Sequence, residues 1–597
     1  MKRAALWILA GSVAAVSAAF AYGCVVNDTC ASDGTCARPG DGGTVEAAEA
    51  AVTSAIPDSA GSCVDGGNCS VPADGASEDS PTDTFVCDPT KEPRDQPCVL
   101  ADSDGVFVAS ALVADGGTDA AADAGADAGA SGTLPFAADG SMARPYSTIG
   151  QALANLGKKT RIYVCNGAYA EQVRVTSPVS IYGGLSCPTG SAGAAWAYVG
   201  GNSQVTSPSP DYALSVTGVA SGTVTIEDMA FASPSAIVPG GSSIAALVAA
   251  STVHLRRVTL KAGNGAAGAA GADGISMANY AGVAPSGGPQ VWNGTPSFMP
   301  ISGGPGAINK CAHYGSSAGG DGGLGCAAGP ASPGLGRAGT AVPPAPVTTA
   351  GRDGLSFGSA LPDAGTNANG DDPGADGLSG KAGVAAAPQY YGTLSPGGWM
   401  ASPGGDGAPG NPGQGGAGGS DPFYNACSEG QSIGGGGGGA GGCGGAGGKG
   451  GSGGGASVAI AAFEATIDMQ ECVLGAAAAG AGGPGGAGQD GQAGGAGGDD
   501  VSPGPVHKAG AAGGNGAGGS GGAGGTGGIS VGVLYTGGQL TYDPATSQNI
   551  TLGPPGAGGT AGPAGKHPAI GILTTGYDGS PGETGAAGTS AAFFKVM

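Results

Sequence analysis

Apolar residues recur at fixed offsets in four stretches of the chain. The stretches 243–260 and 457–474 match at every apolar position without a gap. Stretches 212–231 and 529–552 keep the same order of apolar positions, the latter after an expansion of five residues. Within a stretch, apolar and polar residues alternate, as in Val-His-Leu-Arg at 253–256. This alternation predicts short strands with one buried and one solvated face.

The length of these repeats predicts a solenoid. A unit of roughly 20–30 residues is too short to bury its own apolar face, so successive units must stack to form a core. Short strands with Val, Ile and Ala inside and polar residues at the corners favour a parallel β-helix over an α-solenoid. We therefore expect an all-β solenoid over residues 105–597.

Residues 105–260 resemble the opening coils of pectin-lyase-like right-handed parallel β-helix proteins. The similar segments are GVFV at 105–108, ARPYSTIGQAL at 143–153, RIYVCNGAYAEQV at 161–173 and VSIYGG at 179–184. The resemblance implies that the second segment forms a capping helix and that the others form the first coils. Ser147, as an N-cap before the apolar positions up to Leu156, independently predicts that helix. The resemblance implies no single activity, because the fold hosts lyases, hydrolases, esterases and non-catalytic adhesins.

Glycine-rich insertions interrupt the solenoid pattern. Seven glycines stand at three-residue spacing from Gly435 to Gly453, and the spacing returns in four later runs. The insertions are expected at about 263–455, 475–528, 553–566 and 576–590. In three units glycines begin where the apolar pattern ends, so the insertions leave from one corner of successive coils.

The triplet spacing allows more than one structure. Collagen is disfavoured, because each run stops after about six or seven triplets and contains little proline. Flexible loops would suit the conformational freedom of glycine. A bundle of extended, three-residue-per-turn helices of the polyglycine II kind also fits, since glycine at every third position lets backbones approach and exchange hydrogen bonds. The sequence leaves the loop and the bundle open.

The N-terminus predicts export. Met1-Lys2-Arg3 precedes an apolar run over 4–21, as in a secretory signal peptide over residues 1–23. The following Ala-Tyr-Gly-Cys at 21–24 resembles a bacterial lipoprotein box, in which Cys24 would carry the lipid. The alternatives are ordinary cleavage after Ala21 and, third, an uncleaved membrane anchor. Because Val25 is not the aspartate that retains lipoproteins at the inner membrane, we expect an outer-membrane lipoprotein that faces outward.

Charge is concentrated near the N-terminus. The formal charge is −23, and residues 24–142 hold 21 acidic residues but only Arg38, Lys91 and Arg94 as basic ones. Low hydrophobicity with charge of one sign predicts a disordered tether, which we place at 24–104. The whole chain has 21 Lys and Arg residues. Nucleic-acid binding is disfavoured, because it requires clustered cations.

The fourteen cysteines suggest disulfides, which an exported chain permits. Pairing of near neighbours would join Cys30 with Cys36, Cys63 with Cys69, Cys87 with Cys98, Cys165 with Cys187, Cys311 with Cys326, and Cys427 with Cys443. Cys24 then remains for the lipid and Cys472 as a small buried apolar residue of a strand. Sequence alone does not fix this connectivity. No metal-binding spacing competes with it, and no cofactor is expected.

Charged residues recur at one position of the aligned units. Glu227-Asp228, Arg256-Arg257 and Gln470-Glu471 are equivalent. They could form the carboxylate and basic groove of a polysaccharide lyase, or an outward-facing ladder of acids and bases, which we favour. We therefore expect no catalytic residue.

The expected function is that of a non-catalytic surface lipoprotein with a structural, adhesive or matrix-interaction role. The alternatives are a carbohydrate-active β-helix enzyme and an ice- or surface-binding module. The expected partners are the membrane, through the N-terminal lipid, and extracellular polysaccharide or cell-surface matrix.

Overall fold

The computed structural model describes part of the chain. The described residues are 87–110, 138–187, 195–209, 212–275, 282–291, 301–312, 315–324, 339–341, 382–384, 390–419, 434–499, 509–568 and 577–596. They all belong to the second of two compact units, which covers Thr84–Met597. The predicted signal peptide and Cys24 lie outside the described residues. So do six cysteines of the expected disulfides: Cys30, Cys36, Cys63, Cys69, Cys326 and Cys427.

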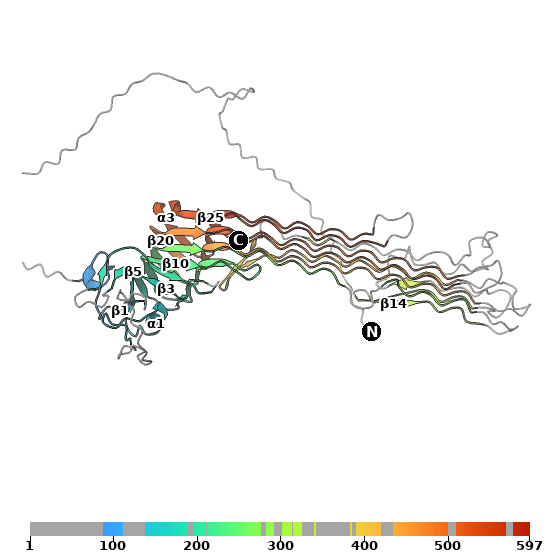
Figure 1. The fold of residues 1–597 in the computed structure, drawn as a ribbon, viewed down its shortest axis with the longest axis horizontal. Helices are drawn as coiled ribbons and strands as arrows, with labels where there is room; N and C mark the ends of the chain where they lie inside the picture. Colours follow the sequence, from blue (N-terminus) through green and yellow to red (C-terminus); the bar gives the residue numbers. More distant parts are fainter. Residues whose placement is uncertain are drawn as a thin grey trace, which may run out of the picture. The chain divides into compact units, whose positions relative to one another are not determined.

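Three parallel sheets form the β part of the structure (Figure 1). In spatial order, the first sheet contains β1 (Gly105–Val108), β2 (Arg161–Cys165), β5 (Ser180–Ser186), β9 (Val224–Glu227), β12 (Thr252–Arg256), β20 (Thr466–Gln470) and β23 (Gln539–Tyr542). A short strand, β6 (Ala197–Tyr198), pairs antiparallel with β5 beside this series. The second contains β24 (Ile550–Leu552), β21 (Val473–Ala476), β13 (Thr259–Ala262), β10 (Met229–Ser233), β7 (Ser203–Thr206) and β3 (Ala168–Ala170). The third contains β25 (Ser590–Lys595), β22 (Ser530–Thr536), β19 (Ser457–Phe463), β11 (Ser243–Ala249), β8 (Leu214–Thr217) and β4 (Val173–Val175).

The chain visits the three sheets in a repeating order. From β11 in the third sheet it passes to β12 in the first and β13 in the second, and β19, β20 and β21 repeat the sequence. The predicted alignment of units is the observed register, because Val253 pairs with Ile467 and Leu260 with Leu474. The all-β prediction and the predicted pairing of the units are therefore confirmed.

The alternation of apolar residues fills one core. In β12, Val253 and Leu255 are buried, while Thr252, His254 and Arg256, which alternate with them, are half-exposed. The same inward positions across the sheets hold Val, Ile, Leu and Met side chains, which form one cluster with 37 buried members. Burial of this apolar surface is the main force that holds the stacked units together.

The predicted helix is present as α1 (Ile149–Ala154), and Ile149 and Ala152 are fully buried in the core. Its N-cap is Thr148, whose side chain accepts a hydrogen bond from the Gln151 backbone N–H; the expected N-cap, Ser147, is one residue too early. Ser147 instead donates from its backbone N–H to the Gln151 side chain. Two adjacent hydroxyl residues both suit a cap, and local sequence did not distinguish them.

Residues 87–104 do not belong to a free tether. A disulfide joins Cys87 to Cys98, which lies within the short 3₁₀ helix Pro97–Val99. Val99 is buried, and its carbonyl accepts a 2.6 Å hydrogen bond from the Tyr163 hydroxyl on β2. This segment therefore packs on the first sheet, and the predicted tether extends too far toward the C-terminus.

The three long insertions leave the second sheet and return to the third. They follow β13, β21 and β24 and precede β19, β22 and β25, which confirms departure from one corner. Their described parts run side by side as wavy traces (Figure 1). We call these parts together the glycine bundle; they are 263–274, 284–291, 301–307, 318–324, 402–419, 434–456, 477–499, 509–529, 553–567 and 577–589.

Backbone hydrogen bonds join the bundle at every third residue. The N–H groups of Gly439, Gly442 and Gly445 donate to the carbonyls of Ala511, Gly514 and Ala517, and the series continues to Gly454 and Thr526. A second row of N–H groups of the same segment donates to carbonyls within 266–272 and 285–291, as from Ser452 to Ala269. Residues 402–419 and 477–499 in turn donate to segment 434–456 from two further sides.

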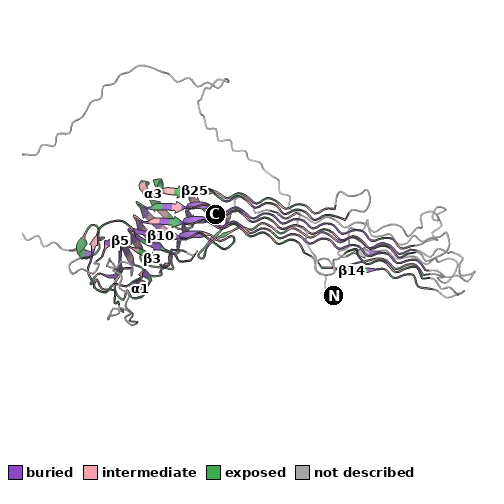
Figure 2. Ribbon diagram, viewed as in Figure 1, coloured by how far each residue is buried: buried purple, intermediate pink, exposed green. Residues whose placement is uncertain are grey.

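Segment 434–456 is therefore surrounded by neighbours, and residues 434–443 are all buried (Figure 2). No bundle glycine has a positive φ, which matches the left-handed, three-residue helix of the polyproline II class. Because a helix of this class has no internal hydrogen bonds, its amides must pair with neighbouring segments, as they do here. The described insertions favour the hydrogen-bonded bundle over flexible loops.

Three disulfides are present among the described cysteines. Cys87–Cys98 and Cys165–Cys187 agree with near-neighbour pairing. Cys311, however, pairs with Cys443, 132 residues away, so the expected pairings of Cys311 with Cys326 and of Cys443 with Cys427 are wrong. The bundle places segments distant in sequence side by side, and spatial neighbours decide the pairing. Cys472 is free and fully buried, as expected.

Two small antiparallel sheets accompany the insertions. One contains β14 (Ile308–Cys311), β15 (Gly315–Ala318) and β16 (Thr340–Ala341). The other is the hairpin of β17 (Gly392–Ser395) and β18 (Gly398–Ala401). Leu394 of the hairpin packs with Leu247 and Val458 on the outer face of the third sheet, which is thereby covered. The last helix, α3 (Pro544–Gln548), lies between β23 and β24.

Candidate functional site

The turn from the first to the second sheet uses one left-handed residue in each of three successive units. Asp228, Arg257 and Glu471 have φ values of 54°, 53° and 54°. These residues follow β9, β12 and β20, which pair in register. The recurring charged positions of the sequence therefore stack at one corner, as predicted, and the backbone conformation that is rare for such residues is imposed by the turn.

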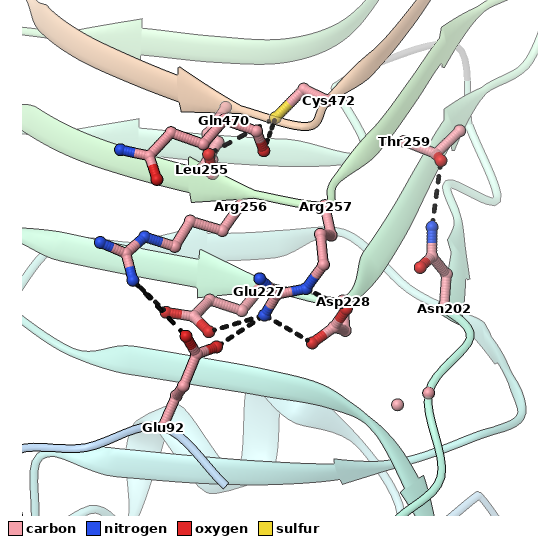
Figure 3. Close-up of polar contacts among 12 residues, drawn as sticks. Glu92, Asn202, Glu227, Asp228, Leu255, Arg256, Arg257, Thr259, Gln470 and Cys472 are labelled. Atoms are coloured by element: carbon pink, nitrogen blue, oxygen red, sulfur yellow. Dashed lines mark hydrogen bonds and ion pairs between the residues drawn. The ribbon is translucent and has the colours of Figure 1, made fainter. Parts of the chain in front are cut away.

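Four of the predicted groove residues come together at this corner, with Glu92 as a fifth member (Figure 3). The Arg257 guanidinium donates to Asp228 at 2.8 Å, to Glu92 at 2.6 Å and to Glu227 at 3.1 Å. Arg256 lies farther away, 3.6 Å from Glu92 and 3.9 Å from Glu227. We call these five side chains the corner cluster.

The corner cluster is not the solvated ladder that the sequence favoured. The side chains of Glu227 and Asp228 are 3% and 7% exposed, whereas Arg256 is 38% exposed. Glu92 comes from outside the repeats and shares the Arg257 guanidinium with both of these carboxyl groups. Glu471 does not join them; its backbone N–H donates to Asp543 instead.

Glu92 was missed because no pattern connects it with the repeats. It lies within the loop closed by Cys87–Cys98, about 135 residues before Glu227 in the sequence. The disulfide spacing was the one available signal, since a clipped loop is more ordered than a free acidic segment.

The electrostatics of the cluster are set by burial and by Arg257. Burial, followed by hydrogen bonding to and repulsion by Glu92, raises the pKa of Glu227 to about 8. Burial also acts to raise the pKa of Glu92, but hydrogen bonds with Glu227 and Arg257 outweigh it, and that pKa lies below its ordinary value. With this raised pKa, Glu227 is protonated at neutral pH and can donate a hydrogen bond to the Glu92 carboxylate.

The three acids could also be considered as metal ligands. One oxygen of each of Glu92, Glu227 and Asp228 lies within 4.8 Å of the others. Arg257 donates to all three, however, and supplies the positive charge that a cation would bring. The arrangement is that of an internal ion-pair network rather than a metal site.

A shallow depression lies on the outer face of the second sheet. It has a volume of about 290 Å³, and polar residues on β7 and β13 surround a floor of Ala230 and Ala232. Its lining includes Asn202, Gln204 and Lys261 but neither a carboxyl group nor a member of the corner cluster. Lys261 is the single titratable group among the residues that line this depression, so they offer no pair of groups for acid and base catalysis.

Comparisons with known proteins name no family for this chain: no protein-family model, curated protein or solved structure matches it significantly. A search of the described residues also finds no helix with the length and apolarity needed to cross a bilayer.

The raised pKa of Glu227 predicts a pH dependence of stability. Its pKa rises from 4.5 to about 8 on folding, so the folded state binds more protons between these values. The stabilisation is complete below about pH 4.5 and is lost as pH rises through 8. Glu227→Gln keeps a neutral donor and acceptor in place. Urea unfolding should find the variant similar to the parent at pH 5 and more stable than the parent at pH 9.

The matched control is Glu92→Gln. Because Glu92 is ionised in the cluster, this change should destabilise the protein at pH 7. Burial, the largest cause of the raised pKa of Glu227, remains in this variant, so the alkaline loss should persist but begin at a lower pH than in the parent. Parallel pH profiles for the parent and Glu227→Gln would show that Glu227 does not carry the proton.

Proposed function

We propose that the chain is a non-catalytic, surface-displayed lipoprotein in which a right-handed parallel β-helix supports a polyglycine II bundle with a structural or adhesive role. The observation that carries the proposal is the bundle itself, whose segments pair their backbone groups at every third residue. Such pairing gives an extended structure made almost entirely of backbone, which suits a structural spacer better than a catalytic site.

The β-helix is supported by the repeating order of strands. Each unit contributes one strand to each of three parallel sheets, and the units pair in register around one core. We infer right-handed coiling from the family resemblance of residues 105–260 and from the general right-handedness of crossover connections between parallel strands. The helix α1 then acts as the cap of the first coil.

A non-catalytic role is supported by the corner cluster. Two of its three acids, Glu227 and Asp228, are buried, and Arg257 joins them to Glu92, so the cluster clamps residues 87–104 to the first sheet. A general acid must instead reach the substrate through hydrogen bonds of about 3 Å. Glu227, at 2% exposure, does not offer this.

Cys24→Ala tests display through a lipid. In bacteria that export the chain, the parent should remain with the outer membrane and react with an impermeant amine label on whole cells. The variant should appear in the soluble fraction with its folded part intact. Retention of the variant in the membrane contradicts the lipid anchor.

The enzyme alternative is tested separately on acidic and neutral polysaccharides. The proposal expects no new reducing ends or unsaturated products from the purified chain. Product formation that disappears in Glu227→Gln, a change that preserves the size of the side chain, would instead assign catalysis to the corner cluster.

A further inference from the structure

The two ends of the three-sheet stack differ in how the core is covered. At the N-terminal end α1 contacts β1, β2 and β4. Its Ile149 and Ala152 side chains are 0% exposed and belong to the core. This end is therefore closed by an element of the chain itself.

At the other end the last strand of each sheet has a neighbour on one side only. These strands are β23, β24 and β25. In the layer before them, the inward side chains are fully buried: Ile467, Met469, Leu474 and Val533. Their register partners in the last layer are half-buried or exposed: Leu540, Tyr542, Ile550 and Phe593. Among the described residues, nothing comparable to α1 covers this layer. We call it the open end.

The open end also presents backbone groups. Gln539 and Asp543 donate their N–H groups to Ala465 and Met469, so alternate residues of β23 face β20. In a parallel ladder successive residues face opposite sides, so Leu540 and Tyr542 direct their backbone N–H and C=O groups away from β20. Such an edge can pair with a strand of another molecule.

The chemistry of the open end suits close contact. β23 and β24 contain no charged residue, and Lys595 is the only one in β25, although the chain carries −23. Tyr542 stacks on Phe593 at 4.3 Å between ring centroids, and Tyr542 is 46% exposed. Two copies can therefore approach here with little like-charge repulsion and can bury aromatic surface.

We propose that the open end binds the open end of a second copy, which forms a two-fold dimer. Only a molecule with three strand edges around a similar core can meet all three edges at once, and a second copy has them. The cap at α1 prevents growth from the other end, so the contact closes as a dimer instead of a filament. This inference is independent of the proposed surface function.

Sedimentation equilibrium tests the dimer. The full chain is used with the substitution Cys24→Ala, so that two copies cannot associate through a lipid. The chain should have twice the monomer mass and dissociate on dilution. Leu552→Asp places two carboxylates at the contact and should weaken dimerisation by about tenfold or more. The control Val473→Asp introduces the same charge in the same sheet at equal exposure, 38% against 37%, and should leave the dimer intact.

Hydrogen exchange of the unaltered strands gives a second readout that needs no variant at the open end. Amides of 539–542, 550–552 and 590–595 should gain protection as concentration rises through the dissociation constant, whereas those of β12 should not change. A monomer at every concentration, or equal loss of the dimer in both aspartate variants, overturns the proposal.

Discussion

Replacement of Arg257 with methionine is expected to cause one of the largest losses of stability in the protein, about 3–5 kcal/mol. The change leaves Glu92, Glu227 and Asp228 facing one another without the guanidinium that donates to all three. Two of these acids are almost fully buried, so water cannot replace the lost partner. Urea unfolding at pH 7 measures the loss.

Arg256→Met is the matched control for this prediction. Arg256 stands next in the chain but is 38% exposed, and its ion pairs are 3.6 and 3.9 Å long. Exposed pairs of this kind contribute about 1 kcal/mol or less. Equal losses in the two variants would mean that Arg257 is not the centre of the cluster.

The second large effect is expected from Gly442→Ala in the middle of the bundle. A Cβ at this position would overlap the backbone carbonyl of Gln492 in the neighbouring segment. Because the obstacle is backbone, whole segments must separate, and the hydrogen bond from Gly442 to Gly514 is strained as well. Overpacking of this kind costs about 1–3 kcal/mol or more. Proteolysis and amide exchange should show local opening around residues 434–456.

Ala481→Val serves as the control within the bundle. Ala481 is exposed, so a larger side chain there points into solvent and changes stability by less than about 0.5 kcal/mol. If Gly442→Ala were as harmless as Ala481→Val, the segments could not be packed backbone against backbone.

The fold of the repeats could be predicted because each unit carries its own alternation. Val253, Ile467 and Leu540 stand at the same place in their units, and these places pair in the sheets. The state of the insertions could not be predicted, since glycine at every third position suits both a solvated loop and a packed helix. Whether the insertions are loops or packed helices depends on which segments become neighbours in space. That, in turn, depends on the shared corner from which the insertions leave.

The candidate site was predicted in part for the same reason. Glu227 and Arg257 occupy equivalent repeat positions, so their proximity followed from the alignment. Burial did not follow, because Glu92 reaches the corner through a segment with no repeat pattern. Cys311 and Cys443 likewise meet only after the bundle has formed, and spacing along the chain gave no sign of that contact.

Amide hydrogen exchange across residues 404–419 and 434–455 tests the central claim most directly. In the hydrogen-bonded bundle, the amides of Gly439, Gly442 and Gly445 donate to carbonyls of segment 509–529 and lie among buried residues. We expect them to exchange orders of magnitude more slowly than unstructured glycine, with protection comparable to that of β19. Complete exchange within seconds at neutral pH would contradict the bundle and leave flexible insertions on a β scaffold.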